Sequence, residues 1–343
     1  MVDIVANFKT NTPLKGDNPK ITILGDPSEK YYIRFIDKEK HVVVNEGHCT
    51  GGQIVAGNRQ WYTDWLIEVY DMAGNRLKTV DFEPTFKKIF IKIDGYALGD
   101  NLAWMPYINK FRKKHNCDVI CSTFYNEFFI KAYPEILFVN PNTEIENVYA
   151  QFYIGAADGP NLNYTPVVAN EVPLQSVASS ILGLEYKEVI PNISFNQRPN
   201  NIEGKYVCLS EWASHEKKMW RDPNGWQNVV DYFNSIGYKV VVISREPTKL
   251  TGIIDRTGDG QLNERINDLF YCEMYLGVSS GLAWLAWAVQ KQVVMVSDFT
   301  PKWHEFSTKN LRFCKNNLTK VDYSEQETTS SKEVIDGIRI LMG

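Results

Sequence analysis

The sequence lacks a segment that could cross a membrane. No uninterrupted apolar run approaches the roughly 18 residues that such a helix requires. The start of the chain, Met-Val-Asp-Ile-Val-Ala-Asn-Phe-Lys, has neither the basic residues nor the apolar core of a secretory signal. With 44% hydrophobic and 23% charged residues, the composition is that of a soluble globular protein. We therefore expect a cytoplasmic protein without a membrane partner.

The chain also has few cysteines and no metal-binding pattern. Its six cysteines are Cys49, Cys117, Cys121, Cys208, Cys272 and Cys314. None belongs to a Cys-x-x-Cys pair, and no histidine stands at the spacing of a zinc ligand. We therefore expect buried, reduced thiols and no metal site.

Two common signatures of nucleotide-using enzymes are absent. The Gly-x-x-x-x-Gly-Lys-Ser/Thr loop of P-loop enzymes does not occur. Neither does the Asp-x-Asp pair that clamps a metal in many nucleotide-sugar enzymes. The net charge of −4 argues against nucleic acid as the main partner. A ligand site therefore has to be sought in the pattern of strands and helices.

The pattern of apolar residues divides the chain into three parts. A length of 343 residues exceeds one ordinary core. Residues 1–85 alternate apolar and polar side chains, which predicts an N-terminal β domain made of one small antiparallel sheet. Residues 86–195 and 196–343 alternate strand-like with helix-like segments, which favours parallel sheets in two Rossmann-like domains. The predicted fold class is α/β.

Two segments about 180 residues apart have the same design. Ile89–Pro106 and Met274–Ala288 each read as a buried strand, a tight glycine-containing turn and a helix. Such turns bind ligands at the carboxyl edge of a parallel sheet. One turn in each half predicts a cleft that is closed from both sides.

The first turn carries a carboxylate. Asp100 follows Gly99 at the start of the predicted helix. There it could accept a proton from a substrate hydroxyl. It could equally be a helix N-cap, which is a common use of aspartate.

The second turn carries serine and glycine. Ser279, Ser280 and Gly281 open a helix whose unpaired amides could bind a phosphate. A serine N-cap without a ligand is the alternative.

Two further positions suit a nucleotide-sugar donor. Lys218 follows a strand and could neutralise a leaving diphosphate, although a solvated loop lysine is the simpler interpretation. Glu246 follows the next strand and could bind a ribose hydroxyl, or it could be a cap or a solvated residue.

Several ordered motifs resemble the bacterial autotransporter O-heptosyltransferases, which are related to the lipopolysaccharide heptosyltransferases. They are the run from Gly99 to Cys117, Lys218-Met219-Trp220, Pro223–Tyr232, Ser244-Arg245-Glu246 and Gly277–Trp287. The N-terminal β domain also resembles this family's extra domain.

The resemblance implies a GT-B fold, in which two Rossmann-like domains face a cleft. It implies an inverting, metal-independent transfer of a sugar, usually heptose from ADP-heptose, to a protein Ser or Thr. Asp100 would be the catalytic base on the acceptor side, residues 86–195. Lys218 would contact the donor phosphate on the donor side, residues 196–343. The implied donor-binding residues are Gly99, Asn101, Ser244, Glu246, Ser279, Ser280, Gly281 and Leu282.

Two features depart from the family. The family has Thr after the Gly-Asp pair, where this chain has Asn101. The family also ends in a cysteine-rich, iron-binding segment that supports a ring-like oligomer, but no cysteine follows Cys314 here. We therefore expect no cofactor besides the nucleotide-sugar co-substrate, and no family iron site, while a homo-oligomer remains open.

Other functions remain compatible with these residues. They are a GT-B glycosyltransferase with a hexose donor or a glycan acceptor, a nucleotide-sugar epimerase of the same fold, and a non-catalytic nucleotide-sugar-binding or assembly protein. The joint presence of Asp100, Lys218 and the Ser-Gly turn argues against the non-catalytic protein. The expected partners are a nucleotide-sugar donor and a protein or glycan acceptor.

Overall fold

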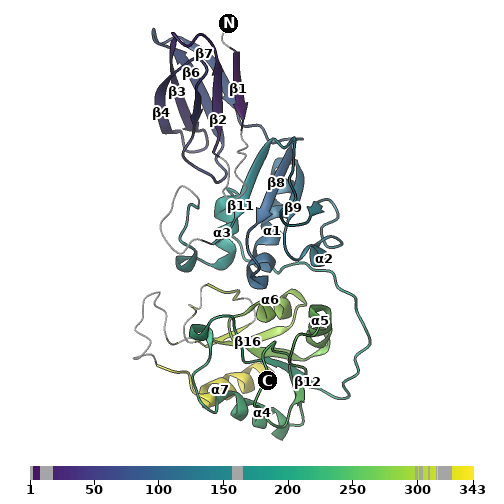
Figure 1. Ribbon diagram of the computed structural model, residues 1–343. Helices are drawn as coiled ribbons and strands as arrows, with labels where there is room; N and C mark the ends of the chain where they lie inside the picture. The colour runs from purple at the N-terminus through teal and green to yellow at the C-terminus, as the bar shows by residue number, and fades with distance from the viewer. Residues whose placement is uncertain are drawn as a thin grey trace.

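The chain forms three units stacked along one axis. Its computed structural model describes residues 3–7, 18–156, 165–297, 300, 304–307, 310–313, 315 and 327–343. Figure 1 shows a β unit at the top, a first α/β unit in the middle and a second α/β unit at the bottom. Among the described residues, no helix is both long and apolar enough to pass through a bilayer.

The N-terminal unit contains two antiparallel sheets, not the single small sheet expected from the sequence. Their strand orders are β1-β2-β5 and β4-β3-β6-β7. The strands are β1 (Asp3–Asn7), β2 (Lys20–Leu24), β3 (Lys30–Asp37), β4 (Val42–Thr50), β5 (Ile54–Ala56), β6 (Trp65–Asp71) and β7 (Arg76–Asp81). β2 buries Ile21 and Ile23, and β3 buries Ile33 and Phe35, all in one core. Because each sheet has one apolar face, the second sheet is needed to cover the apolar face of the first sheet.

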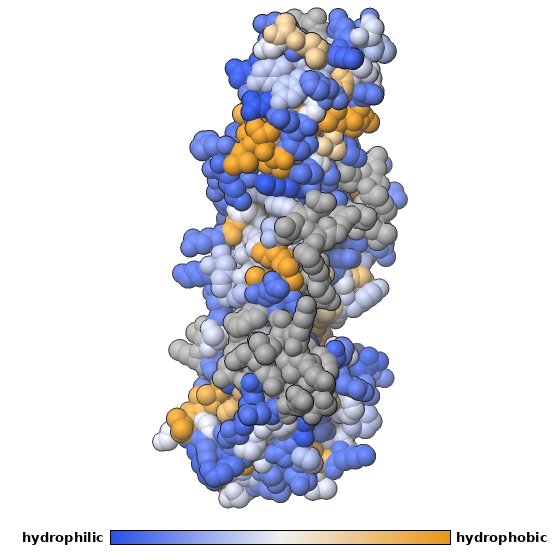
Figure 2. Space-filling view, turned by 90° about the vertical axis from the view of Figure 1, so that its left-hand side faces the viewer, coloured by the Kyte–Doolittle hydropathy of each residue, from blue (hydrophilic) through white to orange (hydrophobic). Residues whose placement is uncertain are grey.

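The polar surface of this unit also carries exposed apolar side chains. Figure 2 shows apolar side chains gathered at two places over it. Its exposed apolar residues include Val42, Ile54 and Leu77.

The middle unit has a four-stranded parallel sheet with the order β10-β9-β8-β11. Its strands are β8 (Lys88–Ile93), β9 (Asp118–Ser122), β10 (Leu137–Val139) and β11 (Ala150–Ile154). Its helices are α1 (Leu98–His115), α2 (Asn126–Phe129) and α3 (Leu174–Ile181), with a 3₁₀ turn at Ala169–Glu171. β8 is buried on both faces, as expected of a strand inside a parallel sheet.

The lower unit has a six-stranded parallel sheet with the order β14-β13-β12-β15-β16-β17. Its strands are β12 (Tyr206–Ser210), β13 (Lys239–Val242), β14 (Ile254–Asp255), β15 (Met274–Gly277), β16 (Gln292–Val296) and β17 (Leu311–Phe313). Its helices are α4 (Gly225–Ser235), α5 (Leu262–Tyr271), α6 (Gly281–Ala288) and α7 (Ser331–Met342), with a 3₁₀ turn at Glu216–Lys218.

Both parallel sheets reverse their strand order next to a central strand. The reversal lies between β8 and β11 in the middle unit and between β12 and β15 in the lower unit. Ligands of open parallel sheets bind at such points, outside the carboxyl ends of the strands. The turns that follow β8, β12 and β15 therefore mark the place where a ligand site is expected.

The two α/β units meet through the first turns of α1 and α6 (Figure 1). A Cβ on Gly99 would lie 3.1 Å from Cδ1 of Trp284, and one on Gly281 would lie 2.8 Å from Cβ of Leu98. Glycine at each position therefore permits the close approach of the two helices. This approach places the start of α1 beside the start of α6.

Candidate functional site

A cleft of about 440 Å³ lies between the two α/β units, at the reversal points of their sheets. Its volume falls in the usual range for small-ligand sites, roughly 300–1,000 Å³. One wall comes from the turn after β8 and the start of α1, and the other from the turns after β12, β13 and β15. The cleft that the two similar turns predicted is therefore present.

Asp100 lines the cleft in the first turn of α1. The helix begins at Leu98 with Ala97 as its N-cap, so the N-cap interpretation of Asp100 is wrong. Burial raises the pKa of Asp100 to about 6, an effect that the positive charge of Lys218 opposes and that Glu305 reinforces. A carboxylate with such a pKa is ionised at neutral pH, yet it is more basic than an exposed aspartate.

Asn101 is fully buried behind this wall. Its side-chain amide donates hydrogen bonds to the carbonyl oxygens of Gly95, at 3.2 Å, and Ala97, at 2.9 Å. It therefore fixes the turn that presents Gly99 and Asp100, and it does not line the cleft.

The opposite wall includes the turn before α6. Ser279, Ser280, Gly281 and Leu282 all line the cleft. The side chain of Ser280 makes no capping hydrogen bond, so a simple serine N-cap does not explain this turn. Ser279 Oγ donates a hydrogen bond to the buried carboxylate of Glu305. The amides of the first turn of a helix lack partners within the helix and are suited to bind an anion.

Positively charged side chains lie on the same wall. Lys218, Arg245 and Arg265 line the cleft together with Glu246. The side chain of Arg265 reaches the carbonyl oxygen of Gly258, while its Nε is buried without a hydrogen-bond partner among the described residues. Three cations beside a helix start make this wall suited to a diphosphate.

Ser244 lies beneath this wall. It is fully buried, and its Oγ donates a hydrogen bond to Ser210 Oγ at 3.1 Å. Ser210 itself lines the cleft. Ser244 is therefore placed to orient Ser210 from behind.

Sequence reasoning missed several residues of the cleft. They include Tyr96, Tyr125, Leu174, Trp212, Arg265, His304 and Glu305. Tyr96 lies within the segment Ile89–Pro106, and Arg245, which was also missed, lies within the motif Ser244-Arg245-Glu246. Their places in these motifs could have suggested both residues. Glu305 could not be found in this way, because only the fold brings it beside Ser279 and Trp284, whose Nε1 donates to it at 2.8 Å.

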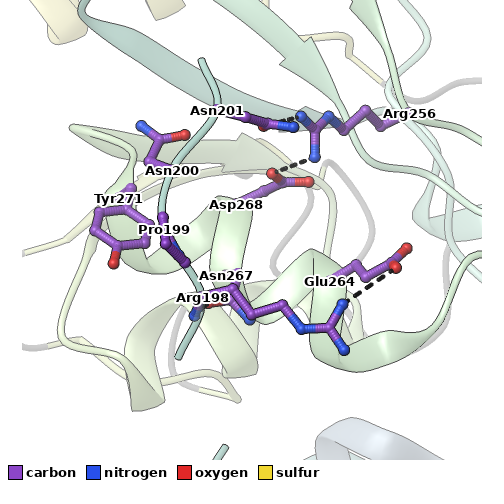
Figure 3. A pocket seen from close by; sticks show the side chains of 9 residues that line it. All are labelled: Arg198, Pro199, Asn200, Asn201, Arg256, Glu264, Asn267, Asp268 and Tyr271. Atoms are coloured by element: carbon purple, nitrogen blue, oxygen red, sulfur yellow. Dashed lines mark hydrogen bonds and ion pairs between the residues drawn. The ribbon is translucent and has the colours of Figure 1, made fainter. Parts of the chain in front are cut away.

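A second, smaller cavity of about 150 Å³ lies between α5 and the interdomain segment, here residues 198–201, which connects the two α/β units. Figure 3 shows the Asp268 carboxylate paired with Arg256, whose guanidinium also meets Asn201. Close by, the backbone amide of Arg198 donates to Asn267 Oδ1 at 2.7 Å. These contacts fasten the interdomain segment to α5, which explains the cavity without a ligand.

Solved structures confirm the predicted GT-B fold. The crystal structure of TibC, a bacterial iron-containing dodecameric glycosyltransferase of enterotoxigenic E. coli H10407, matches 99% of this chain and 96% of its own. Its TM-score is 0.85 and its sequence identity is 23%. TibC in complex with ADP-D-β-D-heptose matches 99% of this chain and 95% of its own, with a TM-score of 0.83 and 22% identity.

The expectation that the protein has no cofactor is contradicted, because TibC is described as iron-containing. The residues described in this structure do not fit an iron site, since no three His, Cys, Asp or Glu side chains among them gather to hold a metal. The five cysteines that the structure describes are free and buried. Cys314 and residues 316–326 lie outside the described part of the chain.

Similarity to curated proteins indicates the family. A scan against models of known protein families finds no match. The inactive autotransporter heptosyltransferase BimC of Burkholderia thailandensis is 28% identical over 294 residues, which cover 82% of this chain and 69% of BimC. The autotransporter heptosyltransferase Aah of Escherichia coli is 30% identical over 298 residues, which cover 82% of this chain and 75% of Aah. With identity at that level across most of both sequences and a shared GT-B fold, the chain belongs to the autotransporter heptosyltransferase family.

Proposed function

We propose that this protein transfers heptose from ADP-heptose to a Ser or Thr hydroxyl of a protein, with inversion at the anomeric carbon. The names of the relatives and the ADP-heptose complex of TibC support the donor. In this proposal residues 86–195 form the acceptor side, and residues 196–343 bind the donor. Residues 1–85 form a separate β domain without a part in the reaction.

On the acceptor side, Asp100 acts as general base. Its carboxylate takes the proton of the acceptor hydroxyl, and the hydroxyl oxygen attacks the anomeric carbon of the sugar. The bond from that carbon to the diphosphate oxygen breaks on the opposite face, and ADP leaves. The basicity that burial gives Asp100 supports this role.

On the donor side, the wall around α6 stabilises the negative charge that grows on the leaving diphosphate. Lys218 and the amides that begin at Gly281 are the principal groups, with Arg245 and Arg265 beside them. Glu246, which follows the strand next to β12, binds a ribose hydroxyl.

One observation carries the proposal. Asp100 and Lys218 come from different units, yet they line the same cleft and interact electrostatically. A base on one wall and a cation on the other is the arrangement that a displacement between an acceptor and a diphosphate donor requires.

Thermal stabilisation by a panel of nucleotides tests the donor. A ligand at 100 times its dissociation constant adds about 2.7 kcal/mol to the free energy of unfolding. We expect ADP and ADP-heptose to raise Tm, and UDP and GDP compounds to have a much smaller effect. Stabilisation by UDP or GDP compounds alone would replace heptose with another sugar, and no stabilisation by any nucleotide would overturn the proposal.

A non-catalytic role is the second candidate, because the relative BimC is described as inactive. Such a protein would bind ADP-heptose without releasing ADP from it. Measuring ADP release with and without acceptor separates the two functions, since the enzyme turns over and the binding protein does not.

The assembly and location of the protein are also proposals. The dodecamer formed by TibC supports a homo-oligomer, which mass photometry of the purified protein tests. The free cysteines among the described residues support a reducing compartment, such as the cytoplasm.

A further inference from the structure

The acceptor side of the cleft carries an exposed aromatic pair that the proposed chemistry does not use. Tyr96 lies in the turn after β8 and is 75% exposed. Its ring lies 3.8 Å, centroid to centroid, from the ring of Phe124. Tyr125 donates a hydrogen bond from its hydroxyl to the carbonyl oxygen of Tyr96 at 2.7 Å. The pair is therefore held in place although one ring faces water.

Two residues of this group lie at the cleft. Tyr96 and Tyr125 both line the cleft that contains Asp100, whereas Phe124 only packs against Tyr96. Tyr96 lies in the turn before α1, four residues ahead of Asp100 in the first turn of that helix. An exposed aromatic surface at a ligand site normally contacts an apolar or amphipathic ligand. The rings therefore form a surface beside the position at which the acceptor hydroxyl is deprotonated.

The charges of the two walls indicate whether the donor or the acceptor contacts this aromatic surface. The cleft residues contributed by the middle unit are Tyr96, Ala97, Leu98, Gly99, Asp100, Tyr125 and Leu174, of which Asp100 alone is charged. A diphosphate would find no cation among them, whereas the opposite wall offers Lys218, Arg245 and Arg265. The aromatic surface is thus left for the acceptor.

We propose that Tyr96, supported by Phe124 and Tyr125, is a platform on which a polypeptide acceptor packs beside its reactive hydroxyl. This inference rests on the proposed function and names the residues that select its acceptor. The strip of neighbouring rings suits the side chains on either side of the hydroxyl residue. Acidic residues in those flanks are disfavoured, because the Asp100 carboxylate repels them and the middle-unit wall holds no cation among its lining residues.

Acceptor kinetics test the platform. The probes are a purified autotransporter passenger domain and synthetic peptides with one central Ser, flanked either by Gly, Ala and Asn or by Glu. We expect Tyr96→Ala to raise the acceptor KM about tenfold. The value of kcat and the dissociation constant of ADP-heptose should stay nearly unchanged, and Tyr96→Phe should behave as wild type because it keeps the ring.

Phe86→Ala is the matched control. Phe86 is 77% exposed and precedes the same strand, β8, at its other end, far from the cleft. Both variants therefore lose an exposed aromatic ring, but only Tyr96→Ala loses a ring that is proposed to contact the acceptor. An equal rise of KM in both variants, or an unchanged KM in Tyr96→Ala, overturns the platform.

The donor half of the reaction separates failure of this inference from failure of the proposed function. ADP-heptose binding and slow ADP release to water need no acceptor. If both occur but no polypeptide probe accepts heptose, the acceptor in the proposed function is wrong together with the platform, and glycans become the candidates. Transfer to a polypeptide with an unchanged KM in Tyr96→Ala overturns the platform alone. If ADP-heptose does not bind at all, the proposed function itself fails.

Discussion

The two walls of the cleft differ in how they handle charge. The wall from the middle unit has one carboxylate, Asp100, among aromatic and aliphatic residues, whereas the wall from the lower unit has Lys218, Arg245 and Arg265. A cation near a carboxylate lowers its pKa, as Lys218 does for Asp100. Keeping the proposed base and the cations that line the cleft on separate walls lets Asp100 stay basic while the opposite wall attracts an anion.

The two walls also use the same strand–turn–helix design in different ways. In α1 the proposed functional group is a side chain in the first turn, Asp100. In α6 the proposed group is the backbone itself, because Ser280 leaves the first amides uncapped. A repeated local design therefore acquires different chemistry from one or two residues. Changing one wall at a time tests the comparison.

The largest effect is expected from removing the base. Asp100→Asn should lower kcat about a thousandfold, because proton removal from the acceptor hydroxyl is lost. The dissociation constant of ADP-heptose, measured by calorimetry, should change little, since the donor binds to the other wall. Asp94→Asn is the control, because its exposed carboxylate lies outside the cleft.

The same assignment predicts a pH profile. Because the pKa of Asp100 is about 6, kcat/KM for the acceptor should fall below about pH 6 as the base becomes protonated. Normal turnover by Asp100→Asn, or a flat profile between pH 5 and pH 7, would contradict the role of Asp100.

A smaller loss is expected on the opposite wall. Lys218→Met should reduce kcat/KM about a hundredfold, because one group that stabilises the leaving diphosphate is removed. ADP should also bind more weakly in calorimetry. Lys217→Met is matched to it, because Lys217 belongs to the same 3₁₀ turn but does not line the cleft. Equal effects of the two substitutions would mean that the loop charge acts non-specifically.

The contact between the walls is expected to be sensitive to one methyl group. Gly281→Ala would bring a Cβ within 2.8 Å of Leu98 Cβ, and overpacking of this kind costs about 1–3 kcal/mol. A lower Tm and weaker ADP binding should follow. In Gly260→Ala the atom nearest to the added Cβ, Glu264 Oε2, is 3.7 Å away, so that variant should resemble wild type. If Gly281→Ala leaves both Tm and ADP binding unchanged, the two α/β units are not held this closely in solution.

The smallest effect concerns stability. The pKa of Asp100 is raised from 3.8 to about 6 by folding, so the folded state binds the proton more tightly than the unfolded state. The resulting destabilisation is full above pH 6 and is relieved as the pH falls toward 4. Asp100→Asn should therefore raise the free energy of unfolding at pH 8 by about 1–2 kcal/mol, since Asp100 keeps some contact with water.

Denaturant unfolding at pH 8 and pH 4 measures this difference. The gain from Asp100→Asn should shrink at pH 4, where the wild-type carboxyl is protonated. A gain that is equal at both pH values would show that it does not come from the ionisation of Asp100.

Local patterns in the sequence were sufficient to predict much of the fold. Alternation of apolar and polar residues within residues 1–85 predicted strands such as β3 and β6, and the apolar starts of Ile89–Pro106 and Met274–Ala288 predicted β8 and β15. These patterns work because the side-chain period of a strand or helix is a local property. The second sheet of the N-terminal unit was missed, because packing of one sheet on another depends on residues far apart in the chain.

The sequence by itself determined which groups could do the chemistry: a carboxylate after one strand, a lysine after another, and a Ser-Gly turn before α6. Tertiary structure alone decided their relation. It placed Asp100 opposite Lys218, moved Asn101 and Ser244 behind the walls, and brought Glu305 to Ser279. The physical reason is that burial, pKa and the facing of two walls arise from contacts between distant segments, and local periodicity carries no information about them.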